Sequence, residues 1–164
     1  MKKVLVLGLI FVVFIVGVIS VNAQNDIVRI HIRANSDSEN DQNVKIMVRD
    51  EINLYLQPIL EEPTTKEEAI NVLNQHLIEL KNIAEKVSGQ DCRVTLGQEY
   101  FPKKTYNQKV YPEGEYTALI IEIGEGKGRN WWCVAFPNMC YTQGEKKVEY
   151  KSFFVEILER LGIL

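Results

Sequence analysis

This sequence of 164 residues has few histidines and cysteines and no excess of basic charge. It has two histidines and three cysteines, and 19 lysines and arginines stand against 22 aspartates and glutamates. A net charge of −3 gives no electrostatic reason to bind nucleic acid or an anionic membrane surface. The cysteines lack the close paired spacing of a zinc site, and the two histidines are far apart in the sequence. The composition therefore predicts no metal and no cofactor.

One long apolar run does occur, at the start of the chain. Residues 1–3 carry two lysines, residues 4–19 are apolar apart from two glycines, and residues 21–23 have the small-residue spacing that a signal peptidase reads. The length of this run approaches but barely reaches the roughly 20 residues needed to span a bilayer. Residues 1–23 are therefore expected to be either a cleaved signal peptide or an uncleaved membrane anchor. Residues 24–164 would then be exported as a single small domain, attached to the membrane only through this leader.

The exported part opens with an alternating segment, residues 27–34. Aliphatic side chains alternate there with Arg29, His31 and Arg33. This period of two predicts a strand with one buried face and a basic face exposed to solvent, which would make His31 a surface residue. Residues 35–38 have the composition of a turn that leads into a helix.

Two helices are expected next. The first follows residues 35–38 and should end or kink at Pro58. The second begins at Thr65, with Glu68 at the capping-box position. Its apolar stripe continues without a break until residues 88–89, where Ser-Gly ends the helix.

The second half of the chain has the composition of strands. Residues 92–96 alternate, whereas residues 117–123 and 131–136 are apolar on both faces, as central strands are. The glycine-rich residues 124–130 between the last two predict a hairpin connection. Residues 106–116, rich in tyrosine, are expected to form a loop.

The closing segment predicts a third helix. Residues 149–161 carry apolar side chains at helical spacing. Together these elements predict an α+β domain with one N-terminal strand, two helices, mainly antiparallel strands and a C-terminal helix.

The cysteines leave two interpretations open. Cys133 and Cys140 could form a disulfide that closes a small loop, or they could be buried thiols, and Cys92 is expected to be a buried thiol in its strand. A cysteine nucleophile would need a base within hydrogen-bond reach, and the only histidines are His31 and His76. An exported cysteine hydrolase acting on cell wall or peptide, with Cys133 and His31, is therefore the alternative to a binding protein.

Two adjacent tryptophans mark a candidate partner-binding patch. Trp131 and Trp132 are neighbours in a predicted strand, so their rings should point to opposite faces. Arg129 and Asn130 lie beside them, and aromatic residues and arginine dominate the energetics of protein interfaces. The alternative is that helices cover both rings.

Several sequence blocks, in a fixed order, carry a resemblance to a known family. They span residues 29–37, 45–50, 101–106, 114–119 and 128–137, and Cys140 follows the last block. On these blocks the chain resembles the stage II sporulation protein R family of endospore-forming bacteria. The block Asn-Trp-Trp-Cys-Val at residues 130–134 is the most specific of them, because two adjacent tryptophans before a cysteine are rare.

This resemblance implies a signalling protein of sporulation and not an enzyme. Similar proteins are made in the forespore and exported across its membrane into the space next to the mother-cell membrane. There they activate a membrane-embedded aspartic receptor protease, which processes the pro-sigma-E precursor in the mother cell. The resemblance thus implies a receptor protease as partner and no catalytic residue. A structural coat or wall-binding module is a third alternative.

Overall fold

The computed structural model describes residues 26–106 and 109–137. Their elements, in chain order, are β1 (Val28–Arg33), α2 (Glu39–Ile59), α3 (Lys66–Gln75), α4 (Leu77–Ser88), β2 (Cys92–Phe101), β3 (Lys104–Tyr106), β4 (Lys109–Tyr111), β5 (Gly114–Ile123) and β6 (Asn130–Phe136). The fold is α+β, as the sequence predicts. No helix within these two ranges is long and apolar enough to cross a bilayer. The expected leader at residues 1–23 and the expected helix at residues 149–161 lie outside the described residues.

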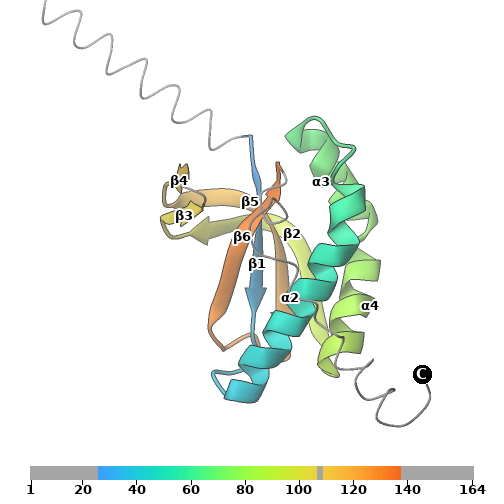
Figure 1. Cartoon of the computed structure of the whole chain (residues 1–164), viewed down its shortest axis with the longest axis vertical. Coiled ribbons are helices and arrows are strands. Elements are labelled where there is room, and N and C mark those ends of the chain that lie inside the picture. Colours follow the sequence, from blue (N-terminus) through green and yellow to red (C-terminus); the bar gives the residue numbers. More distant parts are fainter. Residues whose placement is uncertain (1–25, 107–108, 138–164) are drawn as a thin grey trace, which may run out of the picture.

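The main sheet has four strands in the order β2-β5-β1-β6. β1 pairs with β5 in parallel and with β6 antiparallel, and β2 pairs antiparallel with β5. Figure 1 shows α2, α3 and α4 on one side of this sheet and the short β3–β4 pair on the other. The loop predicted at residues 106–116 is therefore wrong in large part, because it holds the last residue of β3, all of β4 and the start of β5.

Each face of the sheet carries its own apolar cluster. The cluster on the helix side contains aliphatic residues of β1, β5 and β2 together with the buried stripes of the three helices. The cluster on the opposite side is smaller and rich in aromatic residues, among them Phe101, Tyr111 and Tyr116. β1 contributes Val28, Ile30 and Ile32 to the helix-side cluster, and Ile27, just before β1, belongs to the aromatic cluster.

The predicted solvent-exposed basic face of the first strand is wrong. Arg29 is fully buried and His31 is 3% exposed, so only Arg33 of the three is partly open to water. The alternation correctly predicts that these three side chains share a face. The inference that charged side chains must be exposed to solvent is the part that fails. Aromatic side chains from β2, β4 and β5 bury that face. The sequence around β1 contains no local pattern that predicts these contacts.

The predicted hairpin between the last two strands is also wrong. β5 and β6 do not pair, because β1 lies between them. Their glycine-rich connection instead crosses the end of β1 and bonds to the chain that follows it. The Gly128 N–H donates to Ala34 O at 2.8 Å, and the Lys127 N–H donates to Asn35 O at 3.2 Å.

The helix starts follow their sequence signals. The Ser38 side chain caps α2 by accepting the Asp41 N–H. Thr65 and Glu68 form the predicted capping box at the start of α3. Pro58 lies in the last turn of α2, which ends one residue later.

The single second helix of the prediction is two helices. The chain leaves helical geometry at His76, where φ is −105° and ψ is 7°, and α4 begins at the next residue. His76 Nδ1 lies 2.6 Å from the Tyr55 hydroxyl of α2, so a contact between distant residues accompanies the break. The apolar stripe continues across the break, and periodicity alone therefore could not reveal it.

Candidate functional site

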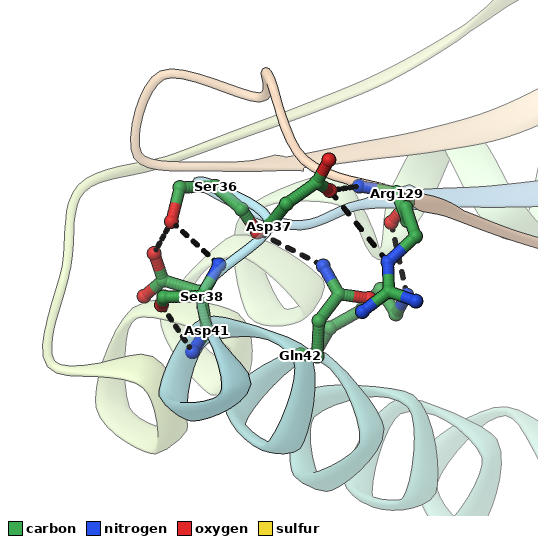
Figure 2. A network of polar contacts seen from close by, with 7 residues as sticks. Ser36, Asp37, Ser38, Asp41, Gln42 and Arg129 are labelled. Atoms are coloured by element: carbon green, nitrogen blue, oxygen red, sulfur yellow. Dashed lines mark hydrogen bonds and ion pairs between the residues drawn. The ribbon is translucent and has the colours of Figure 1, made fainter.

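The four residues of the candidate patch lie where the connection from β5 enters the edge strand β6. Arg129 and Asn130 are exposed, and Trp131 and Trp132 are half-buried. The Arg129 N–H donates to Asp37 Oδ1 at 2.6 Å, and the guanidinium Nε lies 3.7 Å from the same oxygen. The backbone at Arg129 is thus fixed while its side chain remains 69% exposed (Figure 2).

The two tryptophan rings lie on opposite faces of the sheet, as predicted. Trp131 pairs with Ile32 and packs against the helix-side cluster, whereas Trp132 pairs with His31 and packs against the aromatic cluster. Neither ring is fully covered, so the alternative in which helices bury both is wrong. The four residues therefore form an edge with one ring on each side, and not one flat surface.

A cation lies over each ring. The guanidinium carbon of Arg49 is 5.7 Å from the Trp131 ring centre, and Lys104 Nζ is 4.6 Å from the Trp132 ring centre. Such contacts contribute about 0.5–1 kcal/mol where water still reaches the cation. They add positive charge to both sides of the β6 edge.

A polar network holds the turn between β1 and α2, which lies next to Arg129 (Figure 2). The Asp41 carboxylate accepts hydrogen bonds from the Ser36 hydroxyl at 2.5 Å and from Asn35 Nδ2 at 3.0 Å. These bonds lower the pKa of Asp41, with Ser36 making the largest contribution. The Gln42 amide donates to Ser36 O at 2.9 Å. The turn between β1 and α2 is therefore pinned to the first turn of α2.

Lys45 connects this network to the candidate patch. Its ammonium group donates to Gln42 Oε1 at 2.7 Å and to the Arg129 carbonyl at 2.9 Å, and the side chain is almost completely buried. Burial lowers the pKa of Lys45, and the Arg129 charge lowers it further. The sequence analysis did not predict a role for this residue. A signal was available, since Lys45 lies on the same buried helical stripe as Val48 and Ile52.

The opposite face of the sheet holds a buried arginine. Arg29 Nε donates to Cys133 O at 2.9 Å, and Nη2 donates to the Tyr106 hydroxyl at 3.4 Å. Four aromatic rings surround the guanidinium carbon at 4.4–5.7 Å, those of Phe101, Tyr116, Tyr111 and Tyr106. Burial lowers the pKa of Arg29. No carboxylate in the described part of the chain pairs with this charge, so ring faces and neutral oxygens are its partners.

His31 lies beside this cage. Its ring centre is 5.8 Å from that of Phe101 and 5.5 Å from that of Trp132. Nδ1 is 3.8 Å from a Glu99 carboxylate oxygen, and neither ring nitrogen has a partner in hydrogen-bonding geometry. Burial lowers the pKa of His31, and the nearby Asn130 side chain opposes that shift only in part. The folded chain therefore favours the neutral imidazole.

Acidification should therefore destabilise the fold through His31. In the unfolded chain this histidine titrates near its ordinary pKa of about 6.5, so between that value and the lower folded pKa the unfolded state binds more protons. The contribution of neutral His31 is complete above about pH 7 and declines as the pH falls through 6.5. Urea unfolding at pH 7, 6 and 5 measures the decline. His31→Phe keeps an aromatic ring but cannot titrate, and it should lose less stability than the wild type over this range. Parallel losses would contradict the assignment.

The structure does not assemble the cysteine–histidine pair of the hydrolase alternative. Cys133 pairs with Ile30 and packs against the helix-side cluster, whereas His31 points to the opposite face. His31 therefore cannot act as a base for Cys133 in this fold. No group of three metal-binding side chains occurs within residues 26–106 and 109–137.

The other two cysteines are Cys92, in β2, and Cys140. Cys92 is a buried free thiol, as predicted, and burial raises its pKa. Cys140 lies outside the described residues, so the Cys133–Cys140 disulfide stays a prediction.

Comparisons with known proteins bear on the whole of this site. The family model described as Stage II sporulation protein R matches residues 24–146, which include the patch, the network and the arginine cage. The chain is 40% identical over 119 residues to Stage II sporulation protein R of Bacillus subtilis (strain 168). The aligned part covers 70% of this chain and 53% of that protein, so the chain spans about half the length of the curated relative. No solved structure matches the chain.

Proposed function

Because this chain belongs to the stage II sporulation protein R family, and therefore has a role in sporulation, we propose that it activates a membrane-embedded aspartic receptor protease as an exported signal. The receptor would then process the pro-sigma-E precursor in the mother cell. Residues 1–23 would deliver the chain across the forespore membrane into the intermembrane space. The observation that carries the proposal is the family match over residues 24–146.

The edge formed by Arg129, Asn130, Trp131 and Trp132 is the proposed receptor contact. Its backbone is fixed by the Asp37 carboxylate and the Lys45 ammonium group, while the Arg129 and Asn130 side chains project into solvent. A contact whose backbone is already ordered loses little conformational entropy on binding. This rigid edge, with aromatic and cationic groups on both sides, supports its use in recognition.

Activation would need no chemistry from this chain. A ligand shifts a receptor between two arrangements when it binds one of them more tightly than the other. The chain would therefore act by preferring the protease-active arrangement of the receptor. Its own requirement is a surface held in one shape.

Reconstitution tests the proposal directly. The full chain, the receptor protease and the pro-sigma-E precursor would be produced together in cells that lack all other sporulation proteins. We expect the precursor to shorten, and a chain without residues 2–23 to leave it intact. A precursor that stays at full length with all three proteins present would overturn the proposal.

Arg129→Ala is expected to reduce precursor processing without harming the fold. Both hydrogen bonds that fix this position use the Arg129 backbone, so they survive removal of the side chain. An interface arginine at a hot spot contributes at least about 2 kcal/mol, which weakens binding more than tenfold. Titration of the variant against receptor in the reconstituted system measures the change. Lys86→Ala, an exposed cation on α4, is the matched control and should match the wild type. Equal effects of the two variants would contradict the placement of the contact.

A further inference from the structure

The edge of the sheet opposite β6 is a long strand that has no neighbour on its outer side among residues 26–106 and 109–137. β2 pairs only with β5 within the described residues, and the register runs from Cys92 to Phe101 without a bulge. Natural sheets usually protect such edges with lysine, proline, bulges or short strands. β2 contains no lysine and no proline, and its charged residues are one arginine and one glutamate, Arg93 and Glu99. No described part of the chain therefore prevents another strand from pairing with its outer side.

The side to which each backbone group points can be read from two hydrogen bonds. Asp91 O accepts the Gly124 N–H at 2.9 Å, toward β5, whereas the Cys92 N–H donates outward to Glu85 Oε1 at 3.2 Å. Successive residues of a strand point their backbone groups to alternate sides. The residues with outward N–H and C=O groups are therefore Val94, Leu96, Gln98 and Tyr100. No hydrogen bond within the described chain uses these outward groups.

We propose that this edge pairs with the same edge of a second copy of the chain, antiparallel about Leu96. The two sheets would become one continuous sheet across a two-fold axis, a closed arrangement that uses the same surface twice. In this register Leu96 lies opposite Leu96 of the second copy, and Val94 lies opposite Gln98. All of these positions have outward backbone groups, so the interstrand ladder can form.

Charge selects this register over its neighbours. Arg93 and Glu99 share the face of the sheet away from the helices, and pairing about Leu96 places each opposite the other residue of the second copy. Arg93 is 77% exposed and already lies 3.5 Å from a Glu122 carboxylate oxygen, and Glu99 is paired with Arg33 at 2.7 Å. The contacts to the second copy would therefore add to these existing ion pairs. Pairing about Thr95 would place Arg93 opposite Gly97, and pairing about Gly97 would place it opposite Phe101. Only the proposed register gives two opposite-charge pairs.

The remaining pair on that face also fits. Gly97 would lie opposite Thr95 of the second copy, and the space above Gly97 is empty, so the strands can approach there. β2 and β6 are opposite edges of the sheet, which leaves the Arg129 edge free in both copies. The dimer therefore does not depend on the proposed receptor contact, and a failure of either leaves the other standing.

The molar mass of the full chain tests the dimer. Sedimentation equilibrium in density-matched detergent, over a range of concentrations, should approach twice the mass of one chain. Gln98→Pro removes one outward N–H without touching the β2–β5 ladder, so this variant should remain at the mass of one chain. It carries the same leader as the wild type, and association through the leader would therefore appear equally in both. A wild-type mass of one chain at every concentration would overturn the proposal, as would equal association of the two proteins.

Cross-linking tests the register and needs no proline. Leu96→Cys places two thiols across the axis, whereas Gln98→Cys places them roughly four residues apart along the strands, on the order of 13 Å. Oxidation of the full chain in cells should join most of the Leu96→Cys protein into a covalent dimer. Gln98→Cys should stay at the background set by the three native cysteines of the wild type. Equal cross-linking at both positions, or a Leu96→Cys product with a different protein, would overturn the proposal.

Discussion

Gly128→Ala is expected to lower the free energy of unfolding by about 3 kcal/mol, the upper end of what overpacking usually costs. A methyl group at this position would lie 2.1 Å from Ser36 O and 2.9 Å from the Ala34 methyl carbon. The backbone cannot easily retreat, because the Gly128 N–H is bonded to Ala34 O and the next carbonyl accepts from Lys45. The glycine is needed for close approach of two chain segments.

A glycine within the sheet itself provides the control. Gly97 lies in β2, and a methyl group there would meet no atom within 4 Å. Gly97→Ala should be neutral or stabilising by up to about 1 kcal/mol, because alanine has less conformational entropy to lose on folding. Urea unfolding of the wild type and both variants measures the difference. If Gly128→Ala costs no more than Gly97→Ala, then the connection between β5 and β6 is not clamped against the end of β1.

The parts of the fold that local chemistry determines could be predicted from the sequence. The capping box at Thr65 and Glu68 and the helix end near Pro58 involve residues a few positions apart, and both were confirmed. The break at His76 could not be predicted, because its hydrogen-bond partner Tyr55 belongs to another helix. The signal for that break is a single long-range contact with no periodicity.

The order of the strands could not be predicted from the sequence either, because it also depends on contacts between distant residues. Residues 124–130 have the composition of a hairpin, and that composition correctly indicates tight backbone geometry. It does not show what the backbone approaches. The atoms that require glycine at position 128 belong to Ala34 and Ser36, far away in the sequence. Placing β1 between β5 and β6 needs this long-range information.

The candidate site could be predicted in part. The tryptophan pair indicated the Arg129 edge, because rare aromatic residues beside an arginine are unusual on a strand. The residues that hold this edge were not predicted, although Lys45 interrupts an apolar helical stripe and could have been noticed. Arg29 was misread for the opposite reason. An arginine in an alternating strand usually faces water, and only the assembled aromatic cluster removes it from solvent.

Arg29→Ala is expected to cost about 3–5 kcal/mol of folding free energy, the range for truncating a large buried side chain. The substitution would leave a cavity among four aromatic rings and would remove the donor to Cys133 O. Arg33→Ala is the matched control on the same strand face. Arg33 pairs with Glu99 and Glu122 but is 28% exposed, and partly solvated pairs contribute about 1 kcal/mol or less. Thermal and urea unfolding of both variants give the comparison.

The position of Arg29 also predicts which part of the molecule loses protection from hydrogen exchange first when Arg29 is replaced by alanine. Its guanidinium group bonds the Tyr106 hydroxyl, and that hydroxyl donates to Trp132 O at 2.8 Å. Loss of the arginine therefore loosens both the β3–β4 pair and the aromatic side of the β6 edge. Hydrogen exchange of Arg29→Ala should rise in β3, β4 and β6 before it rises in α2 and α4, whose contacts lie on the other face. Uniform exchange across both faces, or a cost no larger than that of Arg33→Ala, would mean that the cage does not hold this edge in place.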